Sequence, residues 1–200
     1  MTAVILPLMV VWPYAPLFWT TYAWAMLPEW RLLRNTRVAA PAGSQDAGSC
    51  RVIVVVDMLA VGLAFALAFC WPATALADLR TAAFWTGVVL LAGGSALRRH
   101  CFEMLGGSFT GAVTVRPGQV VVERGAYRWV RHPSYTAGVL MYAGIGLALT
   151  NWLSLLVLIL APVMAYAYRV RVEERALVET LGEPYLAYMR RTRRFVPFII

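Results

Sequence analysis

Charged residues are scarce in this sequence, and lysine is absent from it altogether. Only 14% of the residues carry a charged side chain, compared with about a quarter in ordinary soluble domains. In their place, 60% of the residues are hydrophobic, and the mean hydropathy is +0.66. The low charge and the long apolar runs exclude an ordinary soluble domain and indicate an integral membrane protein.

Cysteine and histidine are also rare, which argues against disulfide frameworks and against metal sites. The cysteines Cys50, Cys70 and Cys101 are odd in number, unevenly spaced, and form no CxxC motif, so neither a disulfide framework nor a zinc site is expected. Only two histidines occur, His100 and His132, which argues against a histidine-rich metal centre. We therefore predict that the protein binds no metal ion.

Every one of the 18 basic residues is an arginine, and they give a net charge of +8. An excess of this size can indicate nucleic-acid binding. Here, however, the arginines lie beside apolar runs, where they direct topology and contact anionic lipid head groups. We predict membrane lipid as a partner and no nucleic acid, while the sequence leaves the oligomeric state open.

Five apolar runs predict the fold class, which is an all-α integral membrane protein with about five transmembrane helices. The last two runs are short and are separated only by Asn151, so they predict a tight helical hairpin over residues 137–168. Residues 1–200 are expected to form a single membrane domain. The five runs cover about residues 4–27, 52–71, 82–97, 137–150 and 152–168.

The distribution of arginine predicts the orientation of the chain in the membrane. Arginines are frequent after the first, third and fifth runs, whereas the opposite side carries only Arg80. This asymmetry places the N-terminus outside and the C-terminus in the cytoplasm. Residues 1–97 then hold three N-terminal spans, 98–136 form a cytoplasmic segment, and 169–200 form a cytoplasmic C-terminal helix and tail. The use of arginine alone, with abundant alanine, suggests a bacterial cytoplasmic membrane.

The polar segment before the hairpin ends in the sequence Arg131-His132-Pro133-x-Tyr135. In one interpretation it is only a helix boundary, with Pro133 in the first helical position. In the other, Arg131, His132 and the positive helix N-terminus together bind a ligand that carries a carboxylate. Valines before this motif also predict short extended stretches, at Val113, Val115, Val120 and Val122.

Two adjacent carboxylates follow the hairpin. Glu174 interrupts an apolar helical face, and that arrangement is typical of a carboxylate directed into a pocket. Glu173 lies four residues after Arg169, so a structural ion pair between them is the alternative to a functional role. The apolar residues that share a face with Glu174 are Val170, Leu177 and Leu181.

Taken together, these motifs resemble those of the isoprenylcysteine carboxyl methyltransferase family, over roughly residues 105–197. Related phospholipid N-methyltransferases share the Arg-His-Pro and Glu-Glu elements. The residues that carry the resemblance are Arg131-His132-Pro133-x-Tyr135, Glu173-Glu174-x-x-Leu177, Leu181-Gly182-x-x-Tyr185-x-x-Tyr188, Arg194-x-x-Pro197 and the approach through Leu105-Gly106 to Gly125-x-Tyr127.

The resemblance implies a membrane methyltransferase that depends on S-adenosylmethionine. Its cytoplasmic segment and C-terminal helix are expected to form the cofactor pocket, and a lipophilic or prenylated acceptor is expected to enter from the bilayer. By position, Arg194, Glu174 and Arg191 are the expected catalytic residues. The expected cofactor-binding residues are Arg131, His132, Pro133, Tyr135, Tyr127, Glu173 and Glu174.

The resemblance leaves several alternatives open. Carboxyl O-methylation of an isoprenylcysteine-like acceptor is the first expectation, with N-methylation of a phospholipid or other lipid amine as the alternative. A non-catalytic membrane scaffold that retains the fold is a third. The sequence also departs from many relatives at Ala137, where glycine is common, while Gly138 follows. Cofactor contacts near Ala137 are therefore an open question.

Overall fold

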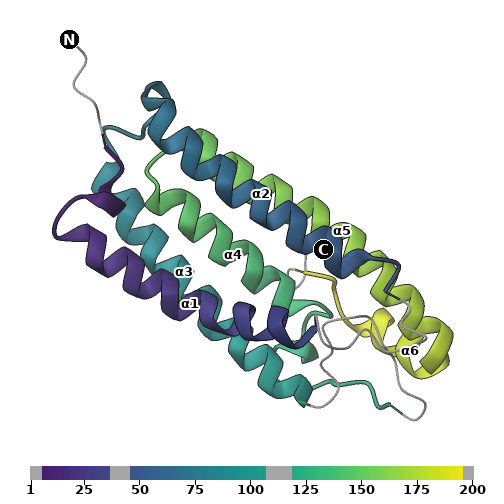
Figure 1. The fold of residues 1–200 in the computed structure, drawn as a ribbon. Helices are drawn as coiled ribbons and strands as arrows, with labels where there is room; N and C mark the ends of the chain where they lie inside the picture. The colour runs from purple at the N-terminus through teal and green to yellow at the C-terminus, as the bar shows by residue number, and fades with distance from the viewer. Residues whose placement is uncertain (1–5, 37–45, 107–118, 196–200) are drawn as a thin grey trace.

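The predicted all-α class is confirmed by a computed structural model that describes residues 6–36, 46–106 and 119–195 (Figure 1). No strand occurs in these described residues, only the isolated bridges Ala75–Asn151 and Val130–Arg193. The helices are η1 (Leu8–Val10), α1 (Tyr14–Thr36), α2 (Ser49–Cys70), η2 (Pro72–Thr74), α3 (Arg80–Leu105), η4 (Gly125–Arg128), α4 (Pro133–Ala148), α5 (Trp152–Leu181) and α6 (Glu183–Arg191).

Two of these helices, α2 and α5, are long and apolar enough to cross a membrane. Their most apolar stretches are largely uncovered by the rest of the protein, with 17% and 39% of the residues buried. Such exposed apolar surface is unfavourable in water and suits a lipid environment. The count of five transmembrane helices stays a prediction.

Several helices begin or end away from the limits of the apolar runs. The first run contains a break before α1, which begins at Tyr14, directly after Pro13. At the other boundaries, α3 continues through Arg98 to Leu105, and α5 continues through both glutamates to Leu181. Hydropathy marks where a helix meets lipid, whereas backbone hydrogen bonds continue into polar sequence. Val120 lies in irregular chain, as does Val122, and Val113 and Val115 lie outside the described residues.

Close contact between α3 and α4 depends on glycine. A Cβ atom at Gly144 would lie 2.5 Å from the backbone nitrogen of Leu91 and 2.6 Å from the carbonyl oxygen of Gly87. A Cβ atom at Gly94 would lie 2.9 Å from the carbonyl oxygen of Ala137. Small residues at such crossings let two helix backbones approach closely, which is how membrane helices gain packing energy.

The predicted turn at Asn151 is also present. Thr150 adopts a positive φ of 54°, and the Asn151 side chain accepts a hydrogen bond from the backbone nitrogen of Ser154, capping α5. Its amide nitrogen also donates to the hydroxyl of Thr74 at 2.7 Å. The turn is therefore tied to η2, which precedes α3.

The helices form an elongated bundle, with α2 beside α5 and α1 beside α3 (Figure 1). Helix α4 lies between α3 and α5, and buried apolar side chains such as Phe84 and Ile145 fill the interior. Helix α6 and the start of α4 lie at one end, whereas the start of α1 lies at the other. This arrangement brings the N-terminus of α4, the polar end of α5 and α6 together.

Candidate active site

Glu174 is the centre of a buried charged cluster at the α6 end of the bundle. Its side chain is only 7% exposed and accepts hydrogen bonds from Arg131, His132 and Arg194. Arg131 Nε lies 2.9 Å from Oε1, and Arg194 Nη2 lies 2.8 Å from Oε2. His132 Nε2 lies 3.3 Å from Oε1. The predicted inward orientation of Glu174 is therefore present, and its oxygens are held by cationic donors on both sides.

The last described residues bring Arg194 to this cluster. The backbone nitrogen of Arg131 donates to the Arg193 carbonyl at 2.7 Å, and that of His132 donates to the Arg194 carbonyl at 3.0 Å. Arg131 Nη1 also donates to the Thr192 carbonyl at 2.5 Å. The segment after α6 thus runs alongside the Arg-His-Pro motif, and residues distant in sequence meet at one carboxylate.

The helix-boundary interpretation of the Arg-His-Pro motif is confirmed, and the ligand-binding interpretation stays a prediction. Pro133 occupies the first helical position of α4, and His132 is the residue that precedes the helix. At the same time, the His132 side chain is 4% exposed and contacts Glu174. The helix boundary therefore fixes the direction of the imidazole, and the motif serves structure and site together.

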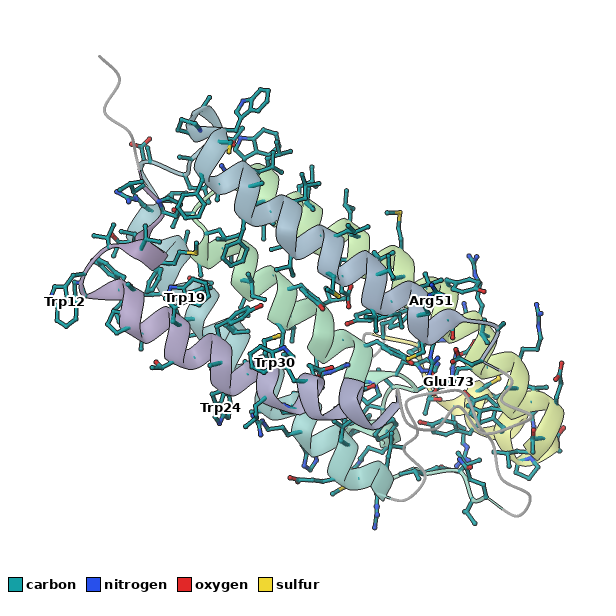
Figure 2. The ribbon with its side chains drawn as sticks, viewed as in Figure 1. Trp12, Trp19, Trp24, Trp30, Arg51 and Glu173 are labelled. Atoms are coloured by element: carbon teal, nitrogen blue, oxygen red, sulfur yellow. The ribbon has the colours of Figure 1, made fainter. Side chains whose placement is uncertain are left out.

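The neighbouring carboxylate, Glu173, makes a different contact, and it lies at the end of the bundle near α6 (Figure 2). The Tyr135 hydroxyl donates to Glu173 Oε2 at 2.7 Å. Arg169 Nε in turn donates to the Tyr135 hydroxyl at 3.3 Å, and Nη1 donates to Ser49 at 2.7 Å and to Asp46. Arg169 is thus linked to Glu173 through a tyrosine, a connection that the i, i+4 spacing alone did not reveal.

Glu174 lies in the polar part of α5, beyond the apolar stretch that ends near Tyr168. Burial acts to raise the pKa of its carboxyl group, but hydrogen bonds from His132, Arg131 and Arg194 outweigh this effect and lower the pKa well below its ordinary value. The group is consequently ionised at neutral pH. A carboxylate held in this way is a weak base and a strong electrostatic anchor.

Two other predicted residues lie at the edge of this cluster or outside it. Arg191 is 61% exposed and pairs with Glu123 at 3.0 Å, away from Glu174. Tyr127 is buried, and its carbonyl accepts a hydrogen bond from Tyr188 at 2.6 Å. The Tyr127 hydroxyl is buried near Ser134 but forms no hydrogen bond of normal geometry with the described residues.

One contact beneath the motif was not predicted from the sequence. Arg98, expected in the cytoplasmic segment, lies in α3 with its side chain 12% exposed. Its Nη1 donates to the Ser134 carbonyl at 2.7 Å, and its Nη2 donates to Glu29 Oε2 at 3.0 Å. Helices α1 and α3 therefore fix the first turn of α4 from the bundle side. The spacing of residues along the chain does not show that Glu29 of α1 lies beside Arg98 of α3, so nothing in the sequence signalled this contact.

Ala137, where many relatives have glycine, lies in a tightly packed part of α4. Ala137 is fully buried and faces α3, where its carbonyl oxygen lies close to Gly94. Gly138 is the residue of close approach, since a Cβ atom there would lie 2.7 Å from the Tyr166 hydroxyl. Helix α4 therefore approaches α3 closely at the Ala137 carbonyl and α5 closely at Gly138.

Fold and site together define a helical membrane protein with a charged cluster at one end of its bundle. Residues 85–179 match the model of the isoprenylcysteine carboxyl methyltransferase (ICMT) family. The family resemblance predicted from the sequence is therefore confirmed over this segment. It includes the Arg-His-Pro motif and both glutamates, whereas Arg194 follows it and Pro197 lies outside the described residues.

Individual relatives agree with the family match. A protein-S-isoprenylcysteine O-methyltransferase of Saccharomyces cerevisiae is 33% identical over 115 residues, which is 56% of this chain and 48% of the yeast protein. The enzyme of the same name from Xenopus laevis is 30% identical over 115 residues, covering 56% of this chain and 40% of its own. This chain therefore spans about half the length, or less, of these two curated relatives.

A solved structure supports the fold over nearly the whole chain. It is that of the eukaryotic intramembrane Ras methyltransferase ICMT, with a TM-score of 0.64 and 23% sequence identity. The superposition covers 98% of this chain and 72% of the other. At this identity the likeness concerns the arrangement of helices alone.

Proposed function

We propose that this protein is an S-adenosylmethionine-dependent methyltransferase that methylates a carboxylate on a lipophilic acceptor at the membrane surface. The observation that carries the proposal is the ionised Glu174, which joins Arg131, His132 and Arg194 in one buried cluster. The relatives' name, protein-S-isoprenylcysteine O-methyltransferase, indicates an isoprenylcysteine-like acceptor.

The donor groups of the cluster fit such a cofactor. The Glu173 carboxylate suits an ammonium group, and the N-terminus of α4 beside His132 suits a carboxylate. When bound, the cofactor supplies an electrophilic methyl group on a positively charged sulfur. The protein contributes orientation and exclusion of water.

The state of Glu174 favours a carboxylate acceptor over an amine. An acceptor carboxylate is already a nucleophile, whereas a protonated lipid amine must first lose a proton to a base. Glu174 is a weak base because three cationic or hydrogen-bonding side chains hold its charge. N-methylation of a lipid amine is therefore the less favoured reaction.

The positions of the exposed arginines and of Trp12 also support an orientation of the chain in the membrane. The exposed arginines Arg124, Arg128 and Arg190 lie at the site end, whereas Arg80 begins α3 at the other end. Trp12 is 80% exposed at that far end, as expected for an interfacial aromatic residue (Figure 2). We place the N-terminus outside and the site in the cytoplasm, with about five spans, in a bacterial cytoplasmic membrane.

The first test is calorimetric binding of S-adenosylhomocysteine to the purified protein in detergent. We expect binding by the wild type and a loss of at least about tenfold in affinity for His132→Ala, because a hydrogen bond to a charged group is removed. His100→Ala is the matched control, since His100 is exposed. Absence of binding by folded wild-type protein would leave the scaffold interpretation.

Arg194 is expected to act on the acceptor more than on the cofactor. Its side chain is 48% exposed while it pairs with Glu174, so it can reach both the cluster and an incoming carboxylate. For Arg194→Ala we expect KM for the acceptor to rise about tenfold or more, with a smaller change in S-adenosylhomocysteine affinity. The control is Arg193→Ala, an exposed neighbour. Equal losses in both measurements would instead mark Arg194 as structural.

A further inference from the structure

Arg169 is a buried cation at the junction of three parts of the fold. It lies on α5, and its side chain is only 6% exposed. Its guanidinium group donates in two directions, from Nη1 to Asp46 and Ser49 and from Nε to the Tyr135 hydroxyl. A planar guanidinium suits this task because its donors are held in a fixed fork, whereas a lysine ammonium has no such geometry.

One end of this network is anchored at the start of α2. Asp46 accepts hydrogen bonds from the Ser49 hydroxyl at 3.1 Å and from the backbone nitrogen of Cys50 at 3.1 Å. The same carboxylate pairs with Arg169. Asp46 therefore accepts hydrogen bonds from the first turn of α2 and also holds the guanidinium, so Arg169 is fixed relative to two helices.

The other end reaches a carboxylate of the proposed cofactor site. Arg169 donates to the Tyr135 hydroxyl at 3.3 Å, and that hydroxyl donates to Glu173 Oε2 at 2.7 Å. An oxygen that accepts one hydrogen bond donates its own more strongly. The tyrosine hydroxyl is thereby oriented toward Glu173, and Glu173 is held in one position.

We infer that Arg169 is a positioning residue for cofactor binding, acting through Tyr135 and Glu173 from an anchor at Asp46. This inference rests on the proposed function, because it concerns the same site. Arg169 thereby has a role in binding although its hydrogen bonds to Asp46, Ser49 and Tyr135 reach neither Glu174 nor Arg194. It also couples the start of α2 to the cofactor site, although α2 contributes none of the predicted site residues.

The test compares Arg169→Lys with Arg171→Lys, since Arg171 lies two residues further along α5 and is exposed. Binding of S-adenosylhomocysteine is measured by calorimetry, with thermal unfolding in detergent as the control for folding. We expect Arg169→Lys to weaken binding about tenfold at an unfolding midpoint close to that of the wild type, because the charge is kept and the fork is lost. Arg171→Lys is expected to bind normally.

A double-mutant cycle with Tyr135→Phe separates positioning from general support of the fold. If Arg169 acts through the tyrosine hydroxyl, Arg169→Lys adds little to the loss already caused by Tyr135→Phe. Losses that multiply in the double variant would overturn the inference, as would normal binding by Arg169→Lys. Failure of the folded wild type to bind would instead overturn the proposed function, and this inference with it.

Discussion

Replacing Glu174 with alanine is expected to weaken S-adenosylhomocysteine binding severely while the protein remains inserted in the membrane. The substitution leaves Arg131, His132 and Arg194 facing one another without the carboxylate that joins them. Removing one partner from a buried ion pair typically costs about 3 kcal/mol or more. Because part of this cluster is open to solvent at Arg194, we expect about a 100-fold loss of affinity, which corresponds to roughly 2.7 kcal/mol.

The matched control for this experiment is Glu179→Ala, an exposed glutamate on the same helix. Glu174→Gln tests charge separately, since the amide keeps the shape of the side chain but cannot hold three donors equally well. Calorimetry reports binding, and circular dichroism in detergent reports folding. Normal binding by Glu174→Ala would remove this residue from the site and with it the observation on which the proposed function depends.

Substituting alanine for Gly144 is expected to cause a large loss of fold stability. The added methyl group would lie 2.5 Å from the Leu91 backbone nitrogen and 2.6 Å from the Gly87 carbonyl oxygen. Both neighbours are backbone atoms, so no side chain can rotate away, and helices α3 and α4 must separate. Overpacking of this kind costs about 3 kcal/mol. The site should suffer too, because α4 carries the Arg-His-Pro motif at its N-terminus.

Gly93→Ala provides the control for Gly144→Ala. Gly93 lies on α3, the helix against which Gly144 of α4 packs, but a Cβ atom at Gly93 would meet nothing within 4 Å. Alanine favours a helix over glycine by about 1 kcal/mol, so this variant should be as stable as the wild type or slightly more so. The measurement is the thermal unfolding midpoint in detergent. Equal midpoints for the two variants would show that the α3–α4 crossing tolerates an extra methyl group.

The functional motifs could be predicted from the sequence because their signals are local. Glu174 interrupts an apolar helical face, and Pro133 marks a helix start, whatever surrounds them. The same holds for the turn at Asn151, where a single polar residue separates two apolar runs. Helix ends were predicted less well. Helices α3 and α5 continue beyond the apolar runs into polar sequence, where hydropathy does not show whether the backbone is still helical.

The partners of the charged groups could not be predicted in the same way. From the sequence, Arg194 was expected to act together with Arg191, yet Arg194 pairs with Glu174 and Arg191 with Glu123. A direct ion pair with Arg169 was one alternative for Glu173, whereas the structure joins the two residues through Tyr135. Ion pairs between distant segments depend on how the backbone crosses, and residue spacing along one helix says nothing about that.

Composition, periodicity and motif spacing are properties of the chain, so the helical membrane character and the family-like motifs follow from the amino-acid sequence alone. Which charges meet depends on the tertiary structure. A buried carboxylate is stable only with donors around it, and the segment after α6 brings one of those donors, Arg194, to Glu174. That convergence depends on packing between elements far apart in sequence, so only the folded arrangement contains it.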